Sequence, residues 1–250
     1  EFRSVVGGFM RLIVYVPGYA RSPEDVLRVN TELVRPSELV VFTDDHHYCV
    51  RGSHDIQCID YGGAEVVLRM LSIARPGDVI VNGAILDSQF SKYYEVARRL
   101  DSRLIGIAGI AERLGSRDAV INGIPHTRIL HGVGPPLFKP LLAIVVNGKP
   151  VIDYINDVLG ALNGVPGTIR RCVDGEVVLG MYALMTGQLM VPWFPGAHRV
   201  GVNHPCSRRS SAYANYMFFK SLIKSGIYIT GVNNYVMMMR YLLNALVHWR

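Results

Sequence analysis

The chain has 250 residues, of which 50% are apolar and only 18% are charged, and its formal net charge is +6. A chain of this length forms one large domain or two small ones, and this apolar content excludes an intrinsically disordered protein. No apolar stretch reaches the roughly 20 residues that cross a bilayer, and the N-terminus lacks the pattern of a signal peptide. We therefore expect a cytoplasmic protein, whose contact with a membrane, if it has one, is confined to the membrane surface.

The first half of the chain predicts strands that alternate with helices. Short apolar runs predict buried strands at Arg11–Pro17, Glu38–Thr43, Gln57–Tyr61, Val79–Asn82 and Arg103–Ile107. Helical spacing of apolar residues predicts helices that run from Ser22 to Val34 and over Ala64–Ala74, Ser88–Leu100 and Ala111–Leu114. This alternation is typical of a parallel sheet that is covered by helices on both faces.

A segment rich in proline and glycine, His131–Pro140, predicts a hinge, and a second series of elements follows it. The series comprises strands at Leu141–Val146, Leu189–Pro192 and Ile227–Thr230, a long loop at Pro192–Arg209, and helices at Val151–Leu162, Val177–Met185, Ala212–Lys224 and Asn234–Trp249. We therefore predict an α/β protein with two Rossmann-like domains, residues 10–134 and residues 141–250. Their parallel sheets would face each other across a cleft.

Four cysteines occur in the chain, and none of them is in C-x-x-C spacing, so a zinc site is not predicted. In an intracellular chain of this size, scattered cysteines are typical of reduced thiols. The alternative is a disulfide between Cys49 and Cys58.

Charge is distributed unevenly along the sequence. No residue after Glu176 is acidic, whereas the basic residues there are Arg199, Arg208, Arg209, Lys220, Lys224, Arg240 and Arg250. A field of one sign favours an anionic ligand or surface, such as a nucleotide phosphate, a nucleic acid or an acidic lipid. A solvated basic face is the alternative.

Several segments resemble those of GT-B glycosyltransferases. The residues that carry the resemblance are Ile129–Pro140 (ILHGVGPPLFKP) at the passage between the domains, Arg75–Ala84, Met181–Pro192 and Ser221–Ile229. The resemblance implies two Rossmann-like domains and transfer of a sugar from a nucleotide sugar to an unknown acceptor (a glycan, lipid or protein). It implies no obligatory metal or cofactor. Three positions depart from the family: Ser221 replaces a glutamate that binds the donor ribose, Asn82 replaces a histidine, and Lys149 alone replaces an arginine and lysine pair that binds the donor phosphates. A GT-B-like scaffold that binds without catalysis therefore stays an alternative.

Candidate catalytic residues follow the predicted strands, because parallel sheets place their sites at the carboxyl ends of strands. Asp44 or His46 is the first candidate for a general base, and Asp87 is the other candidate in the cleft. Gly18 and Tyr19 follow the first strand and open a helix, where unpaired N–H groups favour an anion. Together with Asn82 they would form the loop that faces the acceptor.

Basic and polar residues of the second domain would bind the donor. Guanidinium groups suit bidentate contacts with phosphate and would neutralise the leaving diphosphate. The predicted donor-binding residues are Asn147, Lys149, Arg199, His204, Arg208 and Arg209.

Two further functions remain open. Asp45-His46-His47 matches the signature triplet of DHH phosphoesterases, which would use two metal ions to activate water. The basic C-terminal part could instead bind nucleic acid, with an affinity that falls steeply with salt, although no known nucleic-acid-binding module is recognised.

Overall fold

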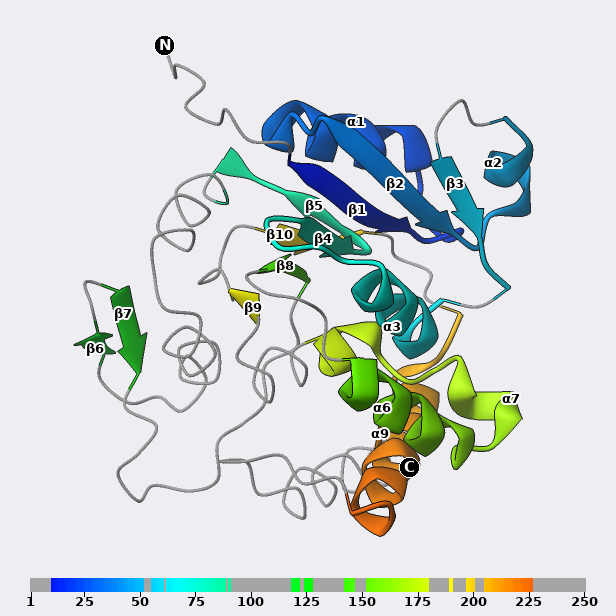
Figure 1. Cartoon of the computed structure of the whole chain (residues 1–250). Helices are drawn as coiled ribbons and strands as arrows, with labels where there is room; N and C mark the ends of the chain where they lie inside the picture. Colours follow the sequence, from blue (N-terminus) through cyan, green and yellow to red (C-terminus); the bar gives the residue numbers. More distant parts are fainter. Residues whose placement is uncertain are drawn as a thin grey trace.

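The apolar runs of the first half form the parallel part of one sheet. The structure is a computed structural model that describes residues 10–51, 55–60, 62–88, 90, 118–121, 124–127, 142–146, 152–179, 189–190, 197–200 and 205–226. Its main sheet has six strands in the order β3-β2-β1-β4-β8-β9 (Figure 1). These strands are β1 (Arg11–Val16), β2 (Glu38–Thr43), β3 (Asp55–Cys58), β4 (Val79–Asn82), β8 (Ala143–Val146) and β9 (Leu189–Met190). The first four are parallel, whereas β8 and β9 each run antiparallel to their neighbour.

Helices cover both faces of this sheet. The helix α1 (Pro23–Val34) lies on one face, and α3 (Ala64–Ser72) lies on the other (Figure 1). The start of α1 is set by Ser22, whose Oγ accepts a hydrogen bond from Asp25 N at 3.3 Å, and by Pro23 in the first turn. The short helix α2 (His46–Arg51) lies beside β3.

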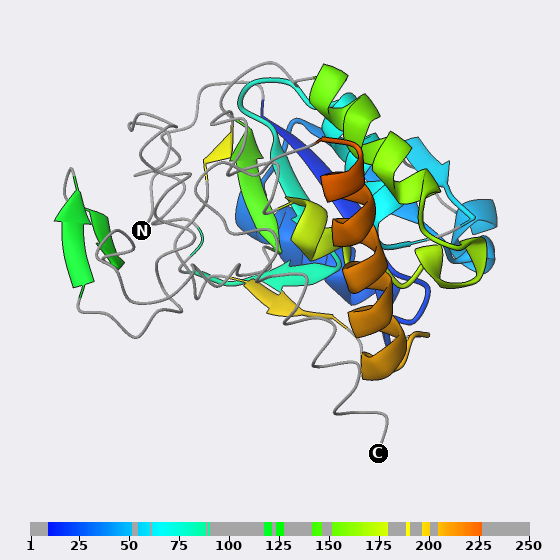
Figure 2. The ribbon, with the colours of Figure 1, turned by 90° about the horizontal axis from the view of Figure 1, so that it is seen from below.

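A layer of helices from the second half lies beyond α3. It contains α6 (Ile152–Asn163), α7 (Gly167–Arg170) and α9 (Arg208–Lys224). The helix α6 packs on α3, and α9 packs on α6 and α7, so α9 is the outermost of these helices (Figures 1 and 2).

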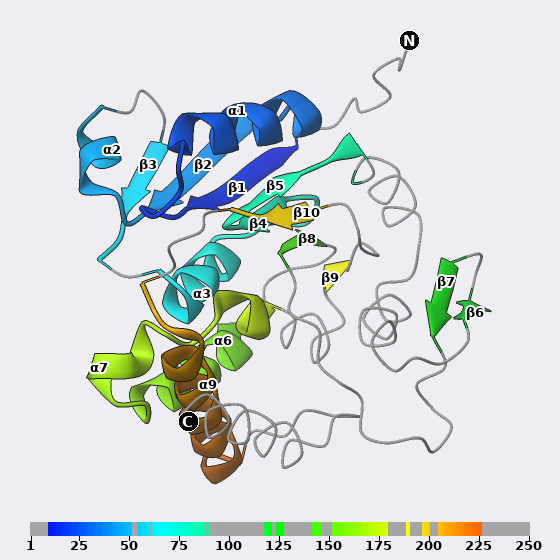
Figure 3. The ribbon, with the colours of Figure 1, turned by 180° about the vertical axis from the view of Figure 1, so that it is seen from behind.

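Two small sheets complete the described part. The strand β5 (Ala84–Leu86) follows β4 directly and pairs antiparallel with β10 (Ala197–Arg199), as Figure 3 shows from behind. Buried Asn30 of α1 holds β5 in place, because its amide donates to Ala84 O at 2.9 Å and accepts from Leu86 N at 2.8 Å. The strands β6 (Asp118–Ile121) and β7 (Ile124–Thr127) form an antiparallel pair.

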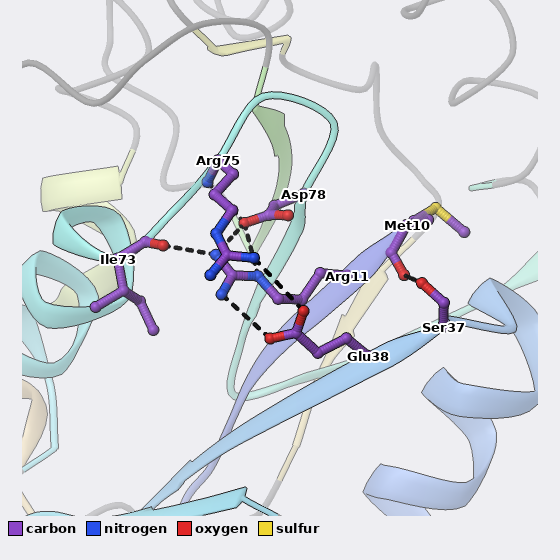
Figure 4. Close-up of polar contacts among 7 residues, drawn as sticks. All are labelled: Met10, Arg11, Ser37, Glu38, Ile73, Arg75 and Asp78. Carbon is purple, nitrogen blue, oxygen red and sulfur yellow. Dashed lines mark hydrogen bonds and ion pairs between the residues drawn. The ribbon is translucent and has the colours of Figure 1, made fainter. Parts of the chain in front are cut away.

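A buried ion pair closes the amino-terminal edge of the parallel strands (Figure 4). Arg11, the first residue of β1, donates from Nη2 and Nε to Asp78 Oδ2 at 2.7 and 3.1 Å. The same Nη2 donates to Ile73 O at 2.6 Å, and the backbone N of Arg75 donates to Asp78 Oδ2 at 2.7 Å. Glu38 lies on the exposed side of the cluster, 3.4 Å from Arg11.

The structure confirms the α/β class and the parallel sheet, but it does not show a second Rossmann-like domain. The strand β8, predicted to open the second domain, instead pairs with β4 and extends the first sheet. Within the described residues, the strands after residue 142 form no parallel sheet of their own. The hinge predicted between the domains lies outside the described residues.

Other predicted elements changed or fall outside the description. The segment Pro192–Arg209 is not one loop, because it contains β10 and the first residues of α9, which Ser207 caps. The short helix α2, which begins at His46, was not predicted from the sequence. The helix predicted at Ser88–Leu100 is described only at residues 88 and 90, and the elements predicted at 103–114 and 227–249 lie outside the described residues.

The expectation of four reduced thiols is wrong. Disulfides join Cys49 to Cys58 and Cys172 to Cys206, with Cα–Cα separations of 5.9 and 5.6 Å. Both separations lie in the usual range for disulfides. The second pair is 34 residues apart in the sequence. Only the docking of α9 beside the segment that follows α7 brings these two cysteines together.

Candidate functional site

A cavity of about 290 Å³ lies at the carboxyl ends of the parallel strands. After β1 the chain crosses to β2 on one side, and after β3 it returns to β4 on the other, so the topology reverses between β1 and β4. Such a switch point is the usual ligand site in open α/β sheets. The charged and polar side chains that line the cavity are Tyr15, Tyr19, Asp44, Asp60 and Asn82 from the first half, and Arg171, Asp174, Glu176 and Arg199 from the second.

Asp44, directly after β2, is fixed by two hydrogen bonds on the same oxygen. Its Oδ1 accepts from Gly18 N at 2.6 Å and from Tyr15 Oη at 3.1 Å. No hydrogen bond in the described part of the chain ends on Asp44 Oδ2, so this oxygen is available to a ligand. Burial, with the nearby charge of Asp44, raises the pKa of Tyr15, which therefore stays a phenol and a donor.

The Tyr15 phenol reaches Asp44 because residue 62 is a glycine. A Cβ atom at Gly62 would lie only 2.1 Å from Tyr15 Oη. Any other residue at this position would displace the phenol from Asp44. The absence of a side chain at Gly62 thus leaves room for the Tyr15 hydroxyl group.

Asn82 ends β4 and lies opposite Tyr15 in the parallel register. Its backbone N donates to Leu142 O at 2.7 Å, and the residue is only 6% exposed. Its side chain lines the cavity, and no hydrogen bond within the described ranges reaches its amide. An amide that lines a cavity and has no hydrogen-bond partner in the described protein is available to a polar ligand.

The second wall of the cavity is fastened to α9. Asp174 accepts from Ser211 Oγ at 2.6 Å and from Asn215 Nδ2 at 2.9 Å, and its backbone N donates to Asn215 Oδ1 at 3.1 Å. The disulfide between Cys172 and Cys206 ties the same segment to the residues that precede α9. These contacts hold Asp174 rigidly, with both carboxylate oxygens occupied.

Tyr19 lies among the charged groups of both walls. Burial raises the pKa of Tyr19 to about 12, the charges of Glu176 and Asp44 add to the effect, and Arg199 opposes it. Arg199 is itself ion-paired with Glu176. At neutral pH Tyr19 is therefore an uncharged phenol that can donate a hydrogen bond.

The cavity carries an excess of negative charge. Four carboxylates line it (Asp44, Asp60, Asp174 and Glu176) against two guanidinium groups (Arg171 and Arg199), which leaves two negative charges. A concave site of one sign favours ligands of the opposite sign or ligands rich in hydrogen-bond donors. Hydroxyl or ammonium groups suit this lining better than phosphate does.

The structure brings some of the predicted catalytic residues together. Asp44, Tyr19 and Asn82 line the cavity, and Gly18 binds Asp44 through its backbone. His46 is exposed at the start of α2 and does not line the cavity. Asp87 lies outside it as well, and its carboxylate contacts His198 Nε2 of β10 at 3.0 Å.

The predicted donor-binding residues are more dispersed. Arg199 lines the cavity but is neutralised by Glu176. Arg208 and Arg209 occupy the first turn of α9, and Arg209 does not line the cavity. Asn147, Lys149 and His204 lie outside the described residues.

Five of the nine polar or charged residues that line the cavity were not predicted from the sequence. Tyr15 and Asp60 carried a signal, because they lie at the ends of the strands that were predicted there. Arg171, Asp174 and Glu176 belong to a segment between predicted helices, where no motif marks them. Their place in the site depends on how the second half docks.

The Asp45-His46-His47 triplet has a local structural role. Asp45 Oδ1 accepts hydrogen bonds from the backbone N of His47 at 2.9 Å and of Tyr48 at 3.4 Å, so it caps α2. Both histidines are exposed. In the part of the chain that the structure describes, no three His, Cys, Asp or Glu side chains are grouped so that they could hold a metal ion.

Across the same residues, no helix is long and apolar enough to cross a membrane. Comparison of the chain with protein-family models, with curated proteins and with solved structures found no match. The GT-B resemblance therefore stays a prediction from the sequence, and the function has to be argued from the cavity.

Proposed function

We propose that the cavity binds the sugar ring of a polyhydroxylated ligand and that the protein transfers a glycosyl group from a nucleotide sugar. The observation that carries the proposal is the Asn82 amide, which lines the cavity and has no hydrogen-bond partner within the described residues. An amide both donates and accepts, and the carboxylates around it only accept. Vicinal hydroxyl groups, which donate and accept, can satisfy both kinds of group at once.

The size and the position of the cavity support this proposal. About 290 Å³ lies at the lower end of the volumes of small-molecule sites, which suits one sugar ring rather than a whole nucleotide sugar. Residues from both halves of the chain line the cavity. A site between the two halves is also what the GT-B resemblance implies. Because the lining has an acidic excess, we place the sugar in the cavity and the donor phosphates outside it.

Asp44 is the general base in this proposal. Its Oδ1 is held by Gly18 and Tyr15, so Oδ2 keeps a fixed direction toward the ligand. A hydroxyl group of the acceptor would donate its proton to Oδ2 as its oxygen attacks the anomeric carbon. The bond from that carbon to the donor's diphosphate oxygen would break in the same step and release the nucleoside diphosphate. The Tyr19 phenol, a donor at neutral pH, would hold another oxygen of the sugar.

The first experiment is calorimetry of the full chain against free monosaccharides, nucleoside diphosphates and their sugar conjugates. We expect saturable binding of one sugar series, which Asn82→Leu abolishes. The same substitution should leave the melting temperature nearly unchanged, because it removes no hydrogen bond within the described residues. If no sugar or nucleotide sugar binds at millimolar concentration, or if Asn82→Leu binds as well as the wild type, the proposal is wrong.

Turnover then separates a transferase from a sugar-binding protein. Asp44→Asn should retain binding and lose transfer by about 100-fold or more, which is the usual contribution of a general base. Asp87→Asn, outside the cavity, is the matched control and should change neither. If the wild type binds a nucleotide sugar without transferring its glycosyl group to any acceptor, the catalytic half of the proposal fails and the binding half stands.

A further inference from the structure

The outer face of α9 has an unusual composition. The side of the helix that faces the protein carries the buried residues Ala212, Ala214, Asn215, Phe218, Phe219 and Leu222. The opposite side carries Arg209, Tyr213, Tyr216, Lys220 and Lys224, which we call the α9 stripe. At 3.6 residues per turn, these five positions fall within about 80° of the helix circumference. Along this line, two aromatic rings lie between one cation on the amino-terminal side and two cations on the carboxyl-terminal side.

The two tyrosines form a platform in the middle of the stripe. Their ring centroids are 6.3 Å apart, and the ring planes meet at 27°. Tyr213 is 37% exposed, although it is a large aromatic residue. These rings do not belong to the core of the helix layer, because the α9 side chains that pack into that core lie on the opposite side of the helix.

No carboxylate of the surrounding sequence balances the two lysines of the stripe. The helix α9 contains no acidic residue, and neither does any later part of the chain. Neither Lys220 nor Lys224 has an ion-pair partner within the described ranges. Both are exposed, and α9 lies at the outside of the helix layer (Figure 2).

We propose that the α9 stripe binds single-stranded nucleic acid. Lys220, Lys224 and Arg209 would contact backbone phosphates, and bases would stack on Tyr213 and Tyr216. From residue 209 to residue 224 the helix rises about 22 Å, which gives contact with several nucleotides. A membrane surface fits less well, because the apolar part of the stripe consists of two tyrosine rings and no exposed aliphatic side chain.

The test is fluorescence anisotropy of a labelled single-stranded 12-mer of thymidylate with the full chain. We expect saturable binding that weakens with salt, with a slope of log K against log[salt] near −2 for three phosphate contacts. Lys220→Gln with Lys224→Gln should reduce that slope by about 1.4. Tyr213→Ala with Tyr216→Ala should weaken binding about tenfold or more, because stacking is lost, and should leave the slope unchanged.

Arg28→Gln with Arg69→Gln is the matched control. It removes the same charge from exposed positions on α1 and α3, and it should leave most of the affinity intact. Equal loss in this control would show non-specific attraction to a basic protein and would overturn the proposal. Absence of saturable binding would overturn it too, as would binding to phosphatidylserine vesicles without binding to the oligonucleotide. Because all six substituted side chains are at least partly exposed, thermal unfolding can verify that each variant folds.

Discussion

The substitution Asp78→Asn tests the buried ion pair at the amino-terminal edge of the sheet. The side chains of Asp78 and Arg11 are 5% and 7% exposed. Removing one partner from a buried pair costs about 3–5 kcal/mol, because the other charge stays buried. Arg11 keeps its hydrogen bond to Ile73 O at 2.6 Å and its contact with half-exposed Glu38. We therefore expect a loss near the lower limit, about 3 kcal/mol.

Urea denaturation measures this loss as a lower midpoint with an unchanged slope. For a chain of this size, about 3 kcal/mol corresponds to a fall in the melting temperature of roughly 6–12 °C. The control is Arg75→Gln, which breaks the exposed contact with Glu38 at 3.6 Å and should cost less than about 1 kcal/mol. If Asp78→Asn costs no more than this control, burial does not set the strength of the pair and the reasoning is refuted.

Three more predictions concern the cavity and its walls. Gly62→Ala should destabilise the protein by about 1–3 kcal/mol through its clash with Tyr15 Oη, and adding Tyr15→Phe should recover part of the loss in urea unfolding. No recovery would show that the clash is not the cause. Removing the disulfide with Cys172→Ser and Cys206→Ser should cost about 4 kcal/mol, since the bridge spans 34 residues, whereas four free thiols in the unreduced protein would contradict it. Because the pKa of Tyr19 rises from 10.0 to about 12, the stability that its neutral form contributes is present below pH 10 and is lost as pH rises toward 12. Tyr19→Phe should remove one late phenol from the alkaline absorbance titration, and an unchanged titration would contradict this assignment.

The first half of the fold could be predicted from the sequence because its signals are local. The strand at Glu38–Thr43 has the predicted bounds, and the helix start at Ser22 and Pro23 was marked by its cap. The second half lacked such signals. The run at Ala143–Val146 reads as a buried strand, but an apolar pattern does not say which sheet the strand joins. Tertiary packing, and not the local sequence, determines that this strand pairs antiparallel with β4.

The candidate site divides in the same way. Asp44 was predicted because it follows a strand of a parallel sheet, where topology alone brings side chains together. Asn82 was predicted from the GT-B resemblance, and it ends another strand of the same sheet. The charge balance could not be predicted, because it depends on which side chains face inward. The charge of Arg199 is neutralised by Glu176, and Asp174 is held in the wall by Ser211 and Asn215 of α9.

The cavity therefore exists only when the second half is docked on the first. The segment that carries Asp174 is bound to α9 on one side. On its other side, Val173 O accepts a hydrogen bond of 3.0 Å from Ala64 N at the start of α3. A ligand that contacts both walls would bind the docked state and not the separated one. By mass action, such a ligand stabilises the docking of the two halves as well as its own site. Ligand binding therefore stabilises the packing of the two halves. A pocket formed by one half alone would not have this effect.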